Sequence, residues 1–176
     1  MLSEWLDTSE DGEWKPVDRA AFSGFTAAVA IIAWFVTRDE GWVPLLDSAN
    51  LAFHEAGHPL FGLMGERITV HGGTMGQLMF PLVVIISFLR KRETLSIALA
   101  ITWFCENMFN IGRYMADARA QILPLVGNGE HDWAEIFMRW GMLEYDLKIA
   151  ASIRLVAWIG LLICWIWMGW RCYSER

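Results

Sequence analysis

The stretch LLDSANLAFHEAGHPLFGLM, residues 45–64, places the motif HEAGH inside an apolar helical pattern. Residues four apart lie on one face of a helix, so His54 and His58 point the same way and can bind one zinc ion. Glu55 then lies beside that ion, where its carboxylate can accept a proton from a bound water. The stretch therefore predicts a metal-binding helix.

The composition places this helix in a membrane protein. Of the 176 residues 55% are hydrophobic and 19% are charged, against roughly 25% charged in soluble domains. The length suits one domain. A net charge of −6 without a basic cluster argues against nucleic-acid binding. Three cysteines with no Cys-x-x-Cys pair predict neither a disulfide framework nor a thiolate zinc site.

Several apolar segments are long enough to approach or complete a membrane span. The polar N-terminal segment 1–19 is acidic, unlike a cleaved signal peptide, so we interpret the charge-free run Ala20–Thr37 as a permanent anchor. Further apolar helices are expected at 45–64, 77–89, 94–112 and 149–170. The sequence thus predicts an all-α integral membrane bundle of about five membrane helices, or four if the HEAGH helix is re-entrant.

The segment after the HEAGH helix predicts a different local structure. Ile68-Thr69-Val70 is β-prone and Gly72-Gly73 is typical of a turn, so we expect a short β-hairpin near residues 66–73. The short basic loop 90–92 is expected to be cytoplasmic. With five spans, that places the N-terminus outside.

Polar side chains form a stripe on each of two predicted helices. The first stripe consists of Asp47, Asn50, His54 and His58, and the second of Glu106, Asn110, Arg113 and Asp117. Neither stripe is tolerated against lipid, so we expect the two to face each other around a polar cavity. An alternative is that Glu106 pairs with Arg113, and Asp117 with Arg119 or Arg113, as ordinary packing contacts of the bundle.

A catalytic zinc site has three protein ligands and a fourth position for water or substrate. The sequence offers four candidates for the third ligand, namely Asp117, Glu106, His131 and Asp132.

These residues resemble the site-2-protease family of intramembrane zinc metallopeptidases. The resemblance covers roughly residues 45–124: the membrane HEAGH helix, the glycine-containing segment, a span, and a helix ending in an Asn…Asp pattern. In that family the third ligand is an Asp in a motif that begins with Asn and passes through prolines to Asp-Gly. Here Asn110 precedes Asp117, without a proline and with Ala118 in place of the Gly.

We expect a single polytopic membrane domain, 1–176, in which the resemblance covers a metallopeptidase-like core at 45–124 and the last apolar run forms a C-terminal membrane helix at 149–170. The resemblance implies the metal ligands and the catalytic groups of an intramembrane zinc metalloprotease that cleaves membrane or juxtamembrane segments. One zinc ion would be held by His54, His58 and Asp117. Glu55 would be the general base, and Asn110 would position the substrate or the developing oxyanion.

The expected partners are a membrane protein or peptide substrate and the lipid bilayer, with no nucleic acid and with oligomerisation or partner subunits left open. We expect a multi-pass protein of a bacterial-type inner (plasma) membrane. Two other functions compete with proteolysis. One is a non-catalytic zinc-binding membrane scaffold or partner-anchoring subunit, and the other is a metal or proton transporter that uses the polar stripes.

Overall fold

The computed structural model describes residues 13–38, 41–126 and 130–174. All regular secondary structure in these residues is helical, which confirms the all-helical prediction. The elements are α2 (Arg19–Val36), α3 (Leu46–Gly62), α4 (Glu66–Arg90), α5 (Thr94–Ala116), α6 (Asp132–Trp140), the 3-10 turn η1 (Leu143–Tyr145) and α7 (Asp146–Ser174). Most of the predicted polar segment 1–19 lies outside the described residues.

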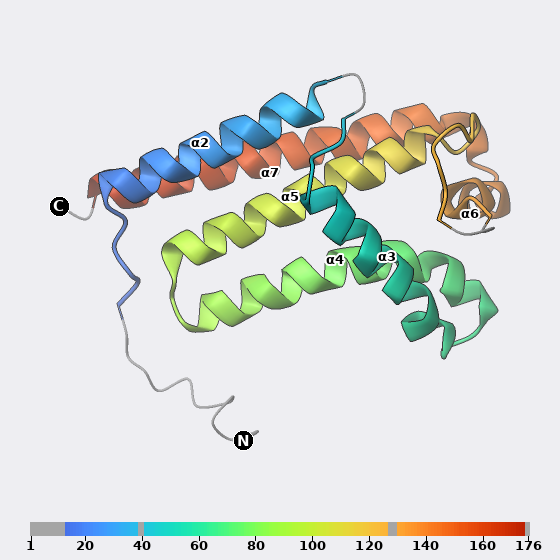
Figure 1. The fold of residues 1–176 in the computed structure, drawn as a ribbon, viewed down its shortest axis with the longest axis horizontal. Coiled ribbons are helices and arrows are strands. Elements are labelled where there is room, and N and C mark those ends of the chain that lie inside the picture. The colour runs from blue at the N-terminus through green and yellow to red at the C-terminus, as the bar shows by residue number, and fades with distance from the viewer. Residues whose placement is uncertain (1–12, 39–40, 127–129, 175–176) are drawn as a thin grey trace.

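The helices are arranged around α5 (Figure 1). Helix α5 packs between α7 on one side and α4 on the other, and α2 lies along α5 and α7. Helix α3 packs mainly on α4 and crosses α5 near the middle of that helix (Figure 1). The short helix α6 lies at the end of the bundle where α5 ends and α7 begins, and it contacts α4 and α5.

Three helical segments in the described part of the chain are long and apolar enough to cross a membrane. They are α2, α4 and the segment Leu143–Ser174, which contains η1 and α7. Large apolar side chains on them face outward; Ile163 on α7 is 62% exposed and Trp34 on α2 is 60% exposed. Such surfaces suit lipid and indicate a membrane protein. The five-span topology, which needs α3 and α5 to cross as well, stays a prediction.

The predicted β-hairpin is wrong, because residues 66–73 form the first turns of α4. The glycines interpreted as a turn lie instead where α3 and α4 cross. A Cβ added to Gly57 would lie 2.1 Å from the carbonyl oxygen of Gly72, and a Cβ on Gly76 would lie 2.7 Å from that of Phe53. Helices approach so closely only through residues without side chains. This packing outweighs the β propensity of the preceding residues.

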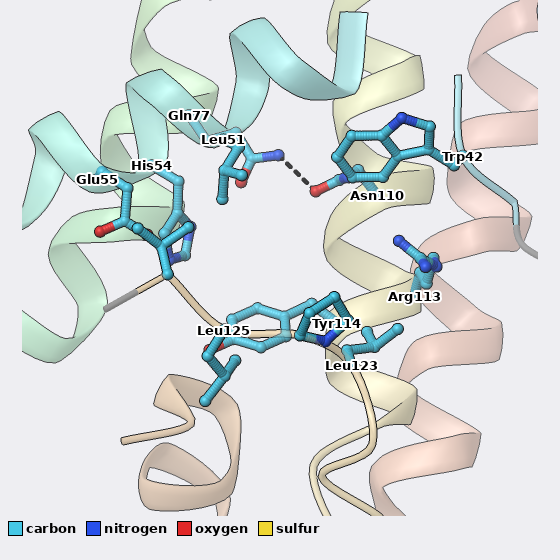
Figure 2. Close-up of a pocket in the computed structure, with 12 residues that line it drawn as sticks. Trp42, Leu51, His54, Glu55, Gln77, Asn110, Arg113, Tyr114, Leu123 and Leu125 are labelled. Carbon is cyan, nitrogen blue, oxygen red and sulfur yellow. Dashed lines mark hydrogen bonds between the residues drawn. The ribbon is translucent and has the colours of Figure 1, made fainter. Parts of the chain in front are cut away.

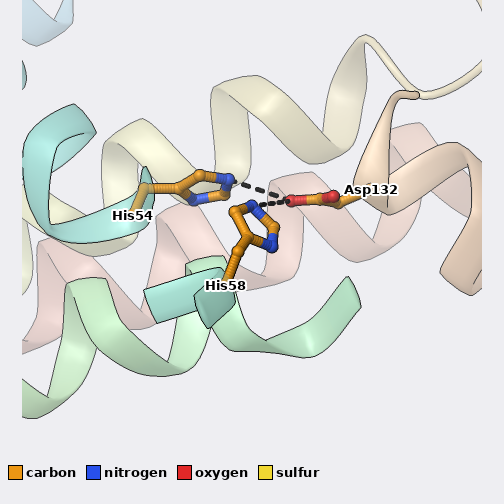
Figure 3. Close-up of side chains that lie close together, drawn as sticks. All are labelled: His54, His58 and Asp132. Atoms are coloured by element: carbon orange, nitrogen blue, oxygen red, sulfur yellow. Dashed lines mark hydrogen bonds and ion pairs between the residues drawn. The ribbon is translucent and has the colours of Figure 1, made fainter. Parts of the chain in front are cut away.

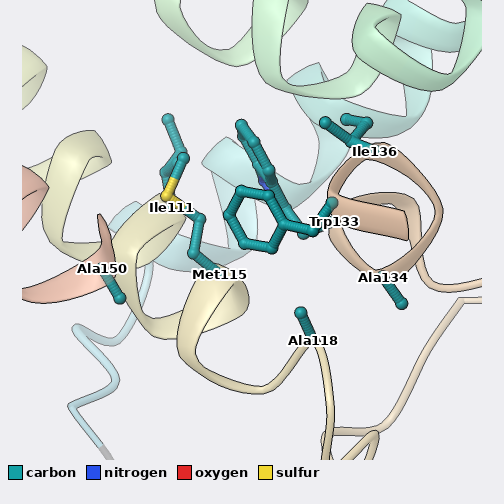
Figure 4. Close-up of a cluster of buried hydrophobic side chains, with 8 residues drawn as sticks. Ile111, Met115, Ala118, Trp133, Ala134, Ile136 and Ala150 are labelled. Atoms are coloured by element: carbon teal, nitrogen blue, oxygen red, sulfur yellow. The ribbon is translucent and has the colours of Figure 1, made fainter. Parts of the chain in front are cut away.

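A buried apolar cluster fixes α6 to the bundle (Figure 4). It contains residues of α5, α6 and α7, together with Ala118: Ile111, Met115, Ala118, Trp133, Ala134, Ile136, Phe137 and Ala150. Phe137 and Ile136 are completely buried there, and burying each such side chain stabilises a fold by roughly 1.5–3 kcal/mol. The cluster therefore holds the N-terminus of α6, which begins at Asp132, in a defined place beside α5.

Candidate metal centre

The two polar stripes meet inside the bundle, as the sequence predicts. Asn50 donates from Nδ2 to Oε2 of Glu106 at 2.7 Å, and Asn110 donates from Nδ2 to Oδ1 of Asp47 at 2.6 Å. Gln77 of α4 completes the network by donating to Oδ1 of Asn110 at 2.8 Å. Buried polar groups are stable only when bonded in this way. Glu106 is therefore bonded to Asn50 and takes no part in the group of residues around the two histidines.

His54, His58 and Asp132 converge at one point (Figure 3). The Nε2 atoms of His54 and His58 lie 2.9 Å and 3.3 Å from Oδ2 of Asp132. One ligand atom from each residue lies within 4.8 Å of the other two. Among the residues that the structure describes, His54, His58 and Asp132 make up the group of side chains that could hold a metal ion. The pair of imidazoles predicted from the sequence does share one face, and Asp132 is the carboxylate that faces it.

Helix α4 orients both imidazoles. Nδ1 of His58 contacts the carbonyl oxygen of Thr69 at 2.9 Å, where an Nδ1–H donates and leaves Nε2 facing Asp132. The ring of His54 lies against Gly73, where an added Cβ would come within 2.5 Å of ring atoms. The glycine-rich start of α4 thus provides both the hydrogen bond and the space that the two rings need.

Contacts at the start of α6 hold Asp132 in place, one with Tyr114 of α5 and one within the cap of α6. Its backbone N–H donates to Oη of Tyr114 at 3.0 Å. The preceding residue, His131, caps the helix, because its Nδ1 accepts from the N–H of Ala134 at 3.2 Å. Burial raises the pKa of Asp132, but hydrogen bonds from His54 and His58 outweigh it and hold that pKa below its usual value. The carboxylate is therefore charged at neutral pH.

The structure places Asp117 outside this group. Its carboxylate accepts hydrogen bonds from the N–H groups of Ile122 and Leu123, both at 3.0 Å, and lies 3.4 Å from Nε2 of His131. Asp117 follows the last residue of α5, so its side chain turns toward the loop that continues from that helix. In the structure the carboxylate beside the histidines is therefore Asp132 rather than Asp117, the residue that the family resemblance implies.

Two cavities open onto the candidate metal centre. The larger, about 390 Å³, is lined by His54 and Asn110 among other residues (Figure 2). The smaller, about 260 Å³, is lined by His58 and Asp132. Both cavities are also lined by Glu55, Tyr114, Leu125 and Val126. The predicted general base thus lies at the junction of the two cavities, and the predicted Asn110 lies in the wall of the larger one.

Sequence reasoning did not identify Tyr114. It lies four residues after Asn110 on α5, on the face that carries the polar stripe, so a search for polar side chains at helical spacing could have included it. Its ring centroid lies 5.7 Å from that of His54 and 4.1 Å from that of His131.

Comparison of the chain with models of known protein families, with curated proteins and with solved structures finds no match. The geometry of the site is therefore the basis for any assignment of function.

Proposed function

We propose that this protein is a membrane zinc metalloprotease that resembles site-2 proteases, with one zinc ion held by His54, His58 and Asp132. One observation carries the proposal: two imidazole nitrogens and a carboxylate oxygen converge within 4.8 Å beside the glutamate of an HEAGH motif. Asp132 replaces Asp117 in the ligand set that the resemblance implies.

The residues fit zinc by the chemistry of their donor atoms. Imidazole nitrogen and carboxylate oxygen are both zinc ligands, and catalytic sites combine three protein ligands with one open position. Open space adjoins the group, since each of the two cavities contacts at least one of the three residues. When bound, zinc would lower the pKa of a water molecule and polarise a peptide carbonyl.

Glu55 supplies the proton transfer in this proposal. Its carboxylate takes a proton from the attacking water, whose oxygen forms a bond to the carbonyl carbon of the substrate. The carbon–nitrogen bond then breaks, and the same proton passes to the leaving amine. The position of Glu55 in the walls of both cavities lets it face a peptide that lies across the site.

The proposed substrate is a membrane or juxtamembrane segment that unwinds locally before cleavage. The larger cavity supports this choice because its wall includes a continuous run of apolar side chains at 123–126.

The proposed topology keeps α3 and α5 as additional membrane helices of a multi-pass inner-membrane protein, with loop 90–92 in the cytoplasm. Arg113 at the cavity wall contacts the ring of Trp42 through its guanidinium, 5.6 Å from the ring centroid.

A second candidate function is a non-catalytic membrane scaffold. The observation in its favour is that Oδ2 of Asp132 contacts both imidazoles directly, so the three side chains satisfy one another by hydrogen bonding. A structural zinc site, however, prefers four protein ligands and has no need of Glu55 or of open cavities beside it.

Glu55→Gln separates the two functions. The amide cannot accept the water proton, so cleavage of a fluorescein-labelled transmembrane-segment peptide in detergent micelles should be abolished while the zinc content stays at the wild-type value. Glu66→Gln is the matched control, because Glu66 is exposed at the start of α4 and should keep full activity. Wild-type rates in the Glu55 variant, or no cleavage by the wild type, would exclude the protease.

A further inference from the structure

Tyr114 lies where the two cavities meet. Tyr114 lines both cavities, as Glu55 does. It lies on α5, close to the end of that helix. Its ring contacts two imidazoles, with centroids 5.7 Å from His54 and 4.1 Å from His131. The ring is therefore fixed beside the candidate metal centre, with its hydroxyl at the N-terminus of α6.

The hydroxyl of Tyr114 retains an unused donor. Oη accepts the backbone N–H of Asp132 at 3.0 Å, which occupies one acceptor position. A phenol also has one O–H to donate, and at neutral pH it is protonated. In residues 13–38, 41–126 and 130–174, no protein group accepts that hydrogen. A donor with no protein acceptor, in the wall of two cavities, is available to a bound molecule.

Asn110, which the family resemblance implies for this role, is occupied by other contacts. Its Nδ2 donates to Asp47 at 2.6 Å, and its Oδ1 accepts from Gln77 at 2.8 Å. These bonds join α5 to α3 and α4, so turning the amide toward a substrate would break buried contacts. The O–H of Tyr114, one turn farther along α5, donates to no protein group among the described residues.

We propose that the Tyr114 hydroxyl donates a hydrogen bond to the carbonyl oxygen of the scissile peptide bond as that oxygen gains negative charge. This inference rests on the proposed protease function and adds a catalytic residue to it. Fixed donors aimed at a developing oxyanion are among the largest contributions to catalysis, because they need no reorientation during the reaction. The contact from the Asp132 N–H holds Oη in place and polarises the phenol toward donation.

The test is Tyr114→Phe, which keeps the ring contacts with the imidazoles and removes only the hydroxyl. With the same labelled transmembrane-segment peptide, kcat should fall roughly 100- to 1,000-fold with little change in KM, since removing one oxyanion donor has an effect of that size. Zinc content should stay at the wild-type value. Tyr145→Phe is the matched control, because Tyr145 lies in η1 with its ring exposed and contacts Lys148.

A second measurement does not depend on turnover. A peptide phosphinate, whose charged oxygen imitates the reacting carbonyl oxygen, should bind Tyr114→Phe more weakly than the wild type by a similar factor. A kcat within threefold of the wild-type value would overturn the assignment. Loss of zinc in the variant would also overturn it, because the hydroxyl would then serve only to hold Asp132. If wild-type protein and Tyr145→Phe both fail to cleave, the protease function itself is excluded.

Discussion

The two halves of this bundle are held together by different means. Helices α2 and α7 pack on α5 through buried apolar side chains, such as Phe25 and Met168, and they expose many others. Helices α3 and α4, in contrast, meet backbone against backbone at Gly57 and Gly72, beside a network of buried polar groups. The first half is packed mainly through apolar side chains, with close approaches at Gly112 and Gly160. The second fixes the positions of individual atoms, as a metal centre requires.

The largest predicted effect is that of adding one carbon to the crossing of α3 and α4. In Gly57→Ala the new Cβ would lie 2.1 Å from the carbonyl oxygen of Gly72, so the helices must separate. We expect a loss of stability of about 3 kcal/mol or more, the upper range for overpacked sites, measured by thermal unfolding in detergent. Gly24→Ala on α2 is the control, since no atom lies within 4 Å of its added Cβ. Equal stability of the two variants would contradict the close crossing.

A smaller effect is expected where α4 meets the metal centre. In Gly73→Ala the Cβ would lie 2.5 Å from the ring of His54 and displace it. Zinc affinity, measured by competition with a chelator, should fall roughly 10- to 100-fold, as it does when other residues that orient a ligand are changed. Unchanged affinity in a folded variant would show that His54 does not bind the metal.

The smallest effect is expected in the apolar half. Met168 of α7 is completely buried in an apolar cluster with residues of α2 and α5, and leucine has nearly the same volume. Met168→Leu should cost less than about 1.5 kcal/mol, and its zinc affinity should equal that of the wild type. A loss larger than that of Gly57→Ala would reverse the contrast between the two halves.

The parts of this fold that follow from local patterns could be predicted from the sequence. Helical spacing places His54 and His58 on one face, and the cost of burying polar groups in an apolar bundle predicts that Asp47 and Asn50 meet the stripe on α5. Both predictions are confirmed by the contacts observed.

The rest depends on long-range packing, which no local pattern encodes. The turn-like residues Gly72 and Gly73 are helical because they contact α3, and this contact is not visible in residues 66–73 alone. The choice of Asp132 among the candidate ligands depends on how the chain returns after α5. That return is set by the apolar cluster around Phe137, which positions α6, and by Asp117, which binds the loop.

Elemental analysis of purified protein shows most directly whether His54, His58 and Asp132 bind one zinc ion. Wild-type protein and Asp117→Asn should each contain close to one zinc ion per chain, because Asp117 only holds the loop and His131. Asp132→Asn should contain little zinc, since an amide is a poor substitute for a charged ligand. Zinc-free wild-type protein, or zinc lost from Asp117→Asn and retained by Asp132→Asn, would contradict the proposed metal centre.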